Sequence, residues 1–331
     1  MKQLTMNLFK NTTLAFGSLL LLLFVVSSCG SNSSTEQTEA DSTTVVLDEK
    51  PEMFFKISLA EWSYHKALQA NEFTNLDFPG KAVELGINAV EYVSVFFDGN
   101  EQDQDYLNKL KSITDSLGVT NVLIMVDREG NLGDLDEAKR IESVENHYKW
   151  VDAAKFLGCH SIRVNARGEG TSEEVKAAAI DGLSRLSEYG AEKGINIIVE
   201  NHGGYSSDGT WLTEVIKGVN NPFCGTLPDF GNFRIEEGKY YDIYKGMEEM
   251  MPFAKGVSAK AYAFDNGPES AVTTGGHGSE DGIIDFGRIM KIVKDAGYTG
   301  YVGIEFEGDG LSEKEGIIKT KEVLELVGSQ L

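Results

Sequence analysis

The fold is decided by residues 195–204, which read Ile-Asn-Ile-Ile-Val-Glu-Asn-His-Gly-Gly. The first five are mostly apolar and β-branched, which predicts a strand buried on both faces. The run then ends in Glu200, Asn201 and His202, before two glycines. In parallel α/β proteins, chemistry is placed at the C-terminal ends of strands. The alternative interpretation is that Glu200 is a solvated loop residue. This interpretation is weaker because other predicted strands also end in polar residues.

Short apolar runs alternate with helical periodicity from Phe54 to the end of the chain. Eight strand–helix units in this length predict an α/β fold, a (β/α)8 TIM barrel. A doubly wound open sheet is the alternative, but no Gly-x-Gly-x-x-Gly follows the first run and the sequence holds no P-loop. The predicted strands are Phe54–Ala60, Ala89–Val95, Asn121–Val126, His160–Asn165, Ile195–Glu200, Gly225–Asp229, Gly256–Ala261 and Tyr301–Phe306.

The helices between these strands have local signals of their own. Thr171 with Glu174, and Ser312 with Glu315, have the spacing of capping boxes and predict two helix starts. A run of apolar residues at spacings of three and four ends before Gly118, which predicts a helix stop there.

The N-terminus reads as a targeting segment. Lys2 and Lys10 precede an apolar run, and Val26-Ser-Ser-Cys29 closes it. This closing sequence resembles a bacterial lipobox, which implies a signal peptide over residues 1–28, acylation of Cys29 and export. The protein is then expected to be a membrane-anchored lipoprotein on the periplasmic or cell-surface side. An ordinary secretory signal is the alternative.

Residues 29–52 are rich in Ser, Thr, Glu and Asp and cannot bury enough apolar surface to fold. We expect the acylated cysteine and a flexible tether here, and a single barrel domain over residues 53–331. The membrane is then contacted through the lipid anchor only. Cys159 and Cys224 each open an apolar run and are expected to be buried free thiols.

The chain carries 30 basic and 52 acidic residues, a formal net charge of −22. This balance argues against nucleic acid as a partner and repels a strongly anionic substrate at long range. A small neutral molecule, or one whose charge meets a bound metal, fits better.

Polar residues gather at the predicted C-terminal ends of the strands, which meet at one mouth in a closed barrel. They are Glu91, Asp127, Arg163, Asn165, Glu200, His202, Asp229, Asn232, Ser258, Lys260, Glu305 and Glu307. Converging carboxylates repel one another unless a cation compensates, so Glu200, Asp229 and Glu305 are candidate ligands for a divalent metal. Oxygen ligands suit Mg²⁺ or Mn²⁺, and an added imidazole would allow Zn²⁺ or Co²⁺. A salt-bridge network with Lys260, Arg163 or Arg167 is the alternative.

At these residues the chain resembles the xylose-isomerase-like barrel family, also called sugar phosphate isomerase/epimerase. The resemblance rests on short segments in a shared order and covers the chain from about Ile57 onward. They are Val199-Glu-Asn-His202, Asp229-Phe-Gly-Asn232, Val257-Ser-Ala-Lys260 and Gly297-Tyr-x-Gly-Tyr-x-Gly-Ile-Glu305. The resemblance implies a metal held by Glu200, Asp229 and Glu305, with sugar-binding groups around it.

Two positions depart from the family pattern. Ser258 stands where ketose epimerases of the family place a metal-binding histidine, and Asn232 stands where many members have histidine. The fourth ligand is then His202, His277 or water.

Other side chains at the predicted mouth are candidates for the chemistry. Lys260 could hydrogen-bond a carbonyl or enediolate oxygen, with a lowered pKa, or could be a counter-ion for the acids. His202, Asn165 and Asn232 are predicted to bind substrate. So are Trp62 and His65, which follow the first strand; core packing is the alternative for Trp62.

The leading hypothesis is a metal-dependent sugar isomerase or epimerase that removes a proton next to a carbonyl. Glu200 or Glu305 would move the proton, with Lys260 or His202 assisting. Export favours an unphosphorylated carbohydrate. One alternative is a 3-keto-glycoside lyase acting by β-elimination. Another is a carbohydrate-binding lipoprotein without turnover. The family's abasic-site endonucleases are disfavoured by the net charge.

Overall fold

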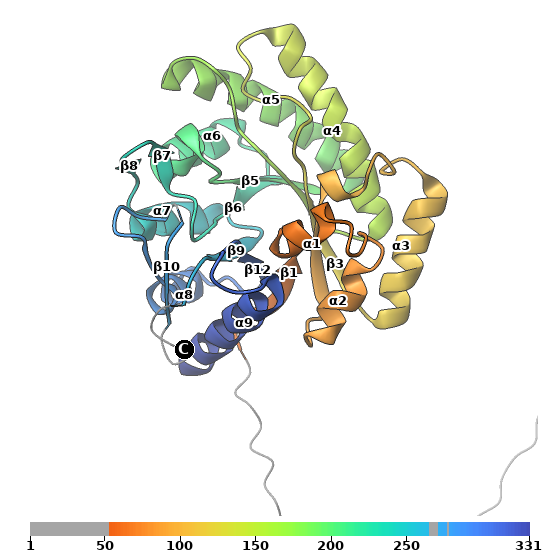
Figure 1. Cartoon of the computed structure of the whole chain (residues 1–331). Coiled ribbons are helices and arrows are strands. Elements are labelled where there is room, and N and C mark those ends of the chain that lie inside the picture. Colours follow the sequence, from red (N-terminus) through yellow and green to blue (C-terminus); the bar gives the residue numbers. More distant parts are fainter. Residues whose placement is uncertain (1–52, 265–270, 277) are drawn as a thin grey trace, which may run out of the picture. The chain divides into compact units, whose positions relative to one another are not determined.

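A sheet of eight parallel strands forms the centre of the protein (Figure 1). The computed structural model describes residues 53–264, 271–276 and 278–331. The order across the sheet is β6-β5-β4-β3-β2-β1-β12-β9. Its strands are β1 (Lys56–Ala60), β2 (Ala89–Val93), β3 (Thr120–Met125), β4 (Ser161–Val164), β5 (Asn196–Glu200), β6 (Cys224–Leu227), β9 (Val257–Ala261) and β12 (Tyr301–Phe306). Each lies within one residue of a predicted strand or inside it, so the strand prediction is confirmed.

The two end strands of this order, β6 and β9, approach each other through isolated parallel bridges. Thr226 bridges Ala254, and Asp229 bridges Ser258. The backbone N–H of Ser258 donates to Pro228 O at 2.9 Å. These contacts curl the sheet into a ring, which is the arrangement expected for the TIM barrel.

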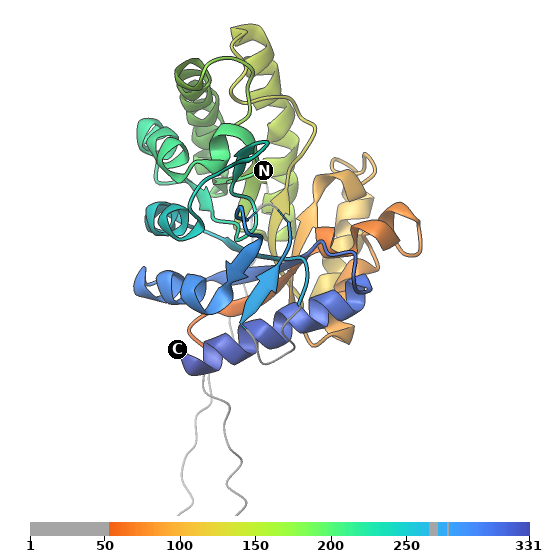
Figure 2. The same cartoon turned by 60° about the vertical axis from the view of Figure 1, so that its left-hand side comes forward.

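Helices cover the outside of the ring, and Figure 2 shows them side by side along it. They are α1 (His65–Gln69), α2 (Phe78–Glu84), α3 (Gln104–Leu117), α4 (Glu137–Leu157), α5 (Ser172–Lys193), α6 (Gly209–Val219), α7 (Ile243–Met250), α8 (Phe286–Asp295) and α9 (Glu313–Gln330). The larger apolar cluster lies between strands and helices. A smaller cluster, including Val93, Met125, Ile198 and Leu227, belongs to the interior of the ring.

The local helix signals are confirmed. The side chains of Thr171 and Ser312 each accept a hydrogen bond from the backbone N–H three residues further on. The side chains of Glu174 and Glu315 in turn accept from the backbone N–H of Thr171 and Ser312, as in a capping box. Helix α3 ends at Gly118, whose φ of 65° is left-handed. Cys159 and Cys224 are free and buried, as predicted.

Two small hairpins were not predicted from the sequence. They are β7 (Arg234–Glu236) with β8 (Lys239–Tyr240), and β10 (Val272–Thr274) with β11 (Ile283–Asp285). Short 3-10 turns are η1 (Glu61–Tyr64), η2 (Ser94–Phe96), η3 (Gly204–Ser207) and η4 (Met251–Phe253). None of the helices in the described ranges is both long and apolar enough to cross a bilayer. The predicted signal peptide, Cys29, the tether and His277 lie outside the described residues.

Candidate active site

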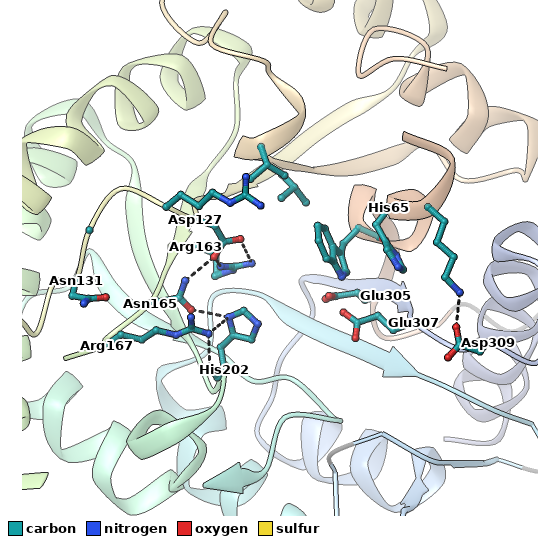
Figure 3. Close-up of a pocket in the computed structure, with 16 residues that line it drawn as sticks. His65, Asp127, Asn131, Arg163, Asn165, Arg167, His202, Glu305, Glu307 and Asp309 are labelled. Atoms are coloured by element: carbon teal, nitrogen blue, oxygen red, sulfur yellow. Dashed lines mark hydrogen bonds and ion pairs between the residues drawn. The ribbon is translucent and has the colours of Figure 1, made fainter. Parts of the chain in front are cut away.

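A cavity of about 770 Å³ opens at the C-terminal ends of the strands (Figure 3). This is the end of a TIM barrel that carries active sites, and the volume suits a small organic ligand. The lining residues lie on β2, β4 and β12 or in the segments that follow β1, β2, β3, β4, β5 and β12. They include Trp62, His65, Lys66, Asp127, Arg128, Asn131, Arg163, Asn165, Arg167, His202, Glu305, Glu307 and Asp309.

The three predicted metal ligands come together at this end. Glu200, Asp229 and Glu305 each offer an oxygen that lies within 4.8 Å of the others, and all three side chains are buried. Glu305 lines the cavity, whereas Glu200 and Asp229 are not among its lining residues. Barrel closure produces this group, because the neighbours β5 and β6 lie at one end of the strand order and β12 lies near the other.

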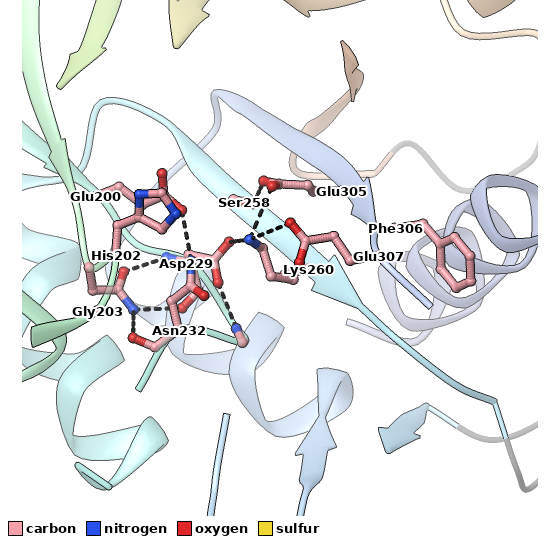
Figure 4. A network of polar contacts seen from close by, with 12 residues as sticks. Glu200, His202, Gly203, Asp229, Asn232, Ser258, Lys260, Glu305, Phe306 and Glu307 are labelled. Carbon is pink, nitrogen blue, oxygen red and sulfur yellow. Dashed lines mark hydrogen bonds and ion pairs between the residues drawn. The ribbon is translucent and has the colours of Figure 1, made fainter. Parts of the chain in front are cut away.

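Cationic side chains contact the same carboxylates (Figure 4). Lys260 Nζ lies 3.0 Å from Glu305 Oε1, 3.2 Å from Glu307 Oε1 and 3.8 Å from Asp229 Oδ2. Strand register explains the first contact, since Glu305 on β12 is paired with Lys260 on β9. Part of the salt-bridge alternative is therefore present in the structure.

Glu200 is held by two neighbours. Arg163 Nε lies 2.9 Å from Glu200 Oε2, although neither atom makes an aligned hydrogen bond. The Asn232 amide donates to Glu200 Oε1 at 2.9 Å. Asn232 is buried and is not among the lining residues of the cavity, so the structure places it as a support for Glu200.

Ser258, at the position where the family resemblance implies histidine, orients Glu305. Its hydroxyl donates to Glu305 Oε2 at 3.0 Å. The other support is Asn201, whose amide oxygen accepts from the backbone N–H of Asp229 at 2.7 Å. Asp229 and Glu305, two of the three candidate ligands, are thus held by hydrogen bonds from the protein, and no histidine takes part.

Burial dominates the ionisation of this cluster. It raises the pKa values of Asp229 and Glu305, and repulsion from the neighbouring carboxylates adds to the effect. Burial alone would lower the pKa of Lys260, but the facing charges of Glu305, Asp229 and Glu307 raise it well above its ordinary value. The sequence-based expectation of a lowered pKa for Lys260 was therefore wrong, because the lysine meets three acids at once.

The donor set fits a divalent cation. Within the described part of the chain, Glu200 Oε2 and Asp229 Oδ2 are buried without a hydrogen-bond partner, which is costly for a carboxylate. In this network the carboxylates of Asp127, Glu200, Asp229, Glu305 and Glu307 face the cations of Arg163 and Lys260. Negative charge is in excess, and a hard cation bound by oxygen ligands would offset it.

A second chain of contacts runs along the opposite wall. Arg163 Nη1 donates to Asp127 Oδ1 at 3.0 Å, and the Asn165 amide donates to the same oxygen at 2.8 Å. Burial opposes ionisation of Asp127, but the charge and hydrogen bond of Arg163 hold its pKa well below the usual range. Asp127 is therefore an ionised anchor for this wall.

His202 extends this chain toward the cavity. Its Nδ1 lies 2.8 Å from Asn165 Oδ1, while Arg167 Nη2 donates to the His202 carbonyl at 3.0 Å. Burial lowers the pKa of His202 to about 3, and the charges of Arg163 and Lys260 add to the effect. His202 is therefore a neutral imidazole, suited to hydrogen bonding with a sugar hydroxyl.

Trp62 and His65 both line the cavity, as predicted. Their rings stack with centroids 5.0 Å apart, and Trp62 also contacts Phe96 at 5.9 Å. His65 Nδ1 lies 2.8 Å from the Trp62 carbonyl, so this turn is held by its own backbone. The pair offers an aromatic edge to a sugar ring.

The sequence interpretation did not include the lining residues Arg128, Asn131 and Asp309, and it placed Glu307 at the mouth without a role. Glu307 had a usable signal. It stands two residues beyond Glu305, and side chains two apart on an extended chain share a face. Burial opposes its ionisation, but Lys260 holds the pKa of Glu307 below its ordinary value.

The fold agrees with the comparison with known families. Residues 79–326 match the family described as Xylose isomerase-like TIM barrel, and the chain belongs to this family. The resemblance stated from the sequence is thereby confirmed.

Curated relatives that share 23–24% identity with the chain are named inosose dehydratases. The chain is 23% identical over 198 residues to an inosose dehydratase from Erwinia tasmaniensis, a match that covers 53% of this chain and 65% of the relative. The match thus spans slightly less than two thirds of that relative.

Solved structures share the fold. A D-tagatose 3-epimerase-like protein has a TM-score of 0.63 at 18% identity, over 82% of this chain and 97% of its own. The 3-keto-D-glucoside 4-epimerase YcjR from E. coli has a TM-score of 0.57 at 14% identity, and the match covers 82% of this chain and 98% of the epimerase. A Xylose isomerase-like TIM barrel protein from Mycobacterium smegmatis was solved in complex with magnesium. It has a TM-score of 0.62 at 14% identity, and the match covers 84% of this chain and 98% of that protein.

Proposed function

We propose that this protein is a metal-dependent sugar isomerase or epimerase that removes a proton next to a carbonyl. The observation that carries the proposal is the buried group of Glu200, Asp229 and Glu305, with two carboxylate oxygens left without hydrogen-bond partners. These three side chains would hold one divalent cation, Mg²⁺, Mn²⁺, Co²⁺ or Zn²⁺. The bound cation would polarise the substrate carbonyl and stabilise the negative charge that develops on its oxygen.

The carboxylates supply the base. Glu305 lines the cavity and its pKa is raised by burial, which moves it toward the range in which a carboxylate accepts a proton effectively. Glu200 is buried beside Arg163, and it is the second carboxylate that can move a proton. Return of the proton to a different carbon, or to the opposite face, gives isomerisation or epimerisation.

Lys260 and His202 assist as hydrogen-bond donors or acceptors. Lys260 remains an ammonium, because it faces Glu305, Asp229 and Glu307. It is therefore a donor to an oxygen that gains negative charge and not a base. The neutral imidazole of His202, with Asn165, Trp62 and His65, positions the sugar.

β-Elimination is the second candidate outcome. One curated relative is an inosose dehydratase, and the 3-keto-D-glucoside 4-epimerase shares the fold. The same proton abstraction, followed by loss of a group from the next carbon, would make this protein a 3-keto-glycoside lyase. A sugar that carries a leaving group at that carbon would distinguish this reaction from isomerisation.

We further propose that the protein is exported as a lipoprotein acylated at Cys29, and that its substrate is an unphosphorylated sugar. Support comes from the lipobox-like sequence and from the acidic side chains of Glu307 and Asp309 at the cavity. Labelling of cells with a radioactive fatty acid tests the anchor. The full chain should be labelled and a Cys29→Ser variant should not.

The experiment that tests the site is elemental analysis of the full chain beside its Glu305→Gln variant. We expect about one divalent ion per chain, a reduced content in the variant, and turnover of ketoses or 3-keto-glycosides by the wild type only. Measurable sugar binding without turnover at saturating metal would contradict the enzyme and indicate a carbohydrate-binding protein. Full activity of Glu305→Gln would refute the site.

A further inference from the structure

The cavity has two walls of opposite charge (Figure 3). The acidic wall comprises Glu305, Glu307 and Asp309, on and after β12. The basic wall comprises Arg128, Arg163 and Arg167, on β4 or after β3 and β4, together with the carboxylate of Asp127, which is paired with Arg163. In a chain with a net charge of −22, a basic wall of three arginines must be explained locally.

The cations on the acidic side already have carboxylate partners. Lys66 Nζ lies 2.7 Å from Asp309 Oδ1, and Lys260 lies within 3.2 Å of Glu305 and Glu307. On the basic wall, Arg163 is committed to Asp127 and Glu200. The charge of these three cations is therefore neutralised within the protein.

Arg128 and Arg167 differ from them. Among the described residues, the Arg167 guanidinium hydrogen-bonds with His202 alone, through the His202 carbonyl at 3.0 Å and Nδ1 at 3.4 Å. Arg128 makes no hydrogen bond or ion pair with the residues that the structure describes, and its side chain is exposed. Both arginines line the cavity, and neither guanidinium has a carboxylate partner in the described ranges.

The backbone of Arg128 is unusual as well. Its φ is 69°, in the left-handed region. The other non-glycine residues with positive φ in the described chain are Asn71, Asp98 and Asn220, which are residue types that tolerate this region. A long side chain in a costly backbone conformation at a ligand cavity is typical of a functional position.

We propose that Arg128 and Arg167 form a subsite for one carboxylate group of the sugar, so that the substrate belongs to the class of acidic sugars, such as a hexuronic acid or its glycoside. This inference rests on the proposed function, since it orients a sugar whose carbonyl end meets Glu305. A planar guanidinium pairs with a carboxylate through two parallel hydrogen bonds. Asn131, which also lines the cavity, adds an amide donor to this side.

A carboxylate fits this cavity better than a phosphate ester. TIM barrels commonly bind phosphate at the loops after the last two strands. Here the segment after β12 is acidic, with Glu307 and Asp309 in the cavity, and would repel a dianion. A single carboxylate at the opposite wall places one charge at the arginines and keeps it away from the acidic group.

Binding of two matched probes tests the subsite. Titration calorimetry of the full chain would compare methyl β-D-glucuronide with methyl β-D-glucopyranoside, which differ only in the carboxylate. We expect the glucuronide to bind about tenfold more tightly, since an ion-paired hydrogen bond contributes at least that factor. In Arg128→Gln and Arg167→Gln the ratio should fall, and in the double variant it should approach one.

Arg234→Gln is the matched control, because Arg234 is exposed on β7 and does not line the cavity. The preference for the glucuronide should survive in it, and thermal melting should show that each variant is folded. Equal binding of the two probes, no binding of the glucuronide, or a preference that persists in the double variant overturns the subsite. Tighter binding of glucose 6-phosphate than of the glucuronide also overturns it.

The subsite and the proposed function fail in different ways. Loss of the glucuronide preference would leave turnover of neutral ketoses, and its dependence on Glu305, untouched. Glucuronide binding that depends on Arg128 and Arg167, without any turnover at saturating metal, would retain the subsite and remove the enzyme.

Discussion

Lys260 Nζ lies 3.0 Å from Glu305 Oε1, and the two residues are paired in register on the neighbouring strands β9 and β12. Both side chains are buried, Lys260 with 2% of its surface exposed. The ammonium therefore compensates part of the negative charge that the cluster of acids concentrates in the barrel. A buried ion pair is costly to break, because the remaining partner keeps its charge without compensation.

Replacing Lys260 by methionine should expose this dependence. Without divalent metal, we expect Lys260→Met to lower the free energy of unfolding by about 3–5 kcal/mol. Saturating Mn²⁺ should recover much of the loss, because a bound cation would then neutralise Glu305 and Asp229. Urea denaturation with and without metal measures both values. Lys291→Met, which breaks an exposed pair with Asp295, is the control and should cost less than about 1 kcal/mol. A loss that metal does not reduce would count against a cation site.

Asn232 should act on the metal through Glu200. Its amide donates to Glu200 Oε1 at 2.9 Å, and such supporting bonds typically change metal affinity by about 10- to 100-fold. We therefore expect Asn232→Ala to weaken Mn²⁺ binding by that factor while the fold persists, as measured by titration calorimetry. Asn131→Ala, in the cavity but without a contact to the acids, should bind Mn²⁺ like the wild type. Unchanged affinity in Asn232→Ala would argue that Glu200 is not a ligand.

Glu91 should make stability fall as the pH rises. Burial raises its pKa to about 8, although Ser58 donates to Glu91 Oε1 at 2.6 Å. The folded state thus keeps a proton up to about pH 8, whereas the unfolded state loses it near the ordinary value of about 4.3. Between these values the unfolded state binds fewer protons, so the wild type loses at most about 5 kcal/mol from pH 4 to pH 8.

The Glu91→Gln variant removes this proton. The free energy of unfolding of Glu91→Gln, relative to that of the wild type, should rise steadily from pH 5 to pH 8 and should be lowest at pH 4. Urea denaturation across this range, at fixed metal concentration, provides the comparison. Glu72→Gln, an exposed position, should follow the wild type. Parallel curves for Glu91→Gln and the wild type would show that Glu91 is ionised in the folded state at neutral pH.

Gly303 should not accept a side chain while Glu91 is present. A Cβ at Gly303 would lie 2.6 Å from Glu91 Oε2 and 2.7 Å from Oε1, closer than van der Waals contact allows. We expect Gly303→Ala to cost about 1–3 kcal/mol of stability, typical of overpacking in a core. In the background of Glu91→Ala the same change should cost clearly less, because the obstructing carboxylate is gone. Equal costs in the two backgrounds would place the strain elsewhere.

The sequence by itself determined the ring of strands and the positions of the acids at its mouth. Apolar runs, capping boxes such as Thr171 with Glu174, and stops such as Gly118 are local patterns, and local backbone preferences were enough to decode them. Glu200, Asp229 and Glu305 could be grouped because parallel strands end at one face, a rule that needs no side-chain coordinates.

Only the tertiary structure decided which charges meet. Register between β9 and β12 sets Lys260 opposite Glu305, and the pairing of β4 with its neighbours β3 and β5 brings Arg163 to both Asp127 and Glu200. The sign of the change in the pKa of Lys260 depends on these distances. Coulomb energies vary with distance and burial, and neither follows from the order of residues along the chain.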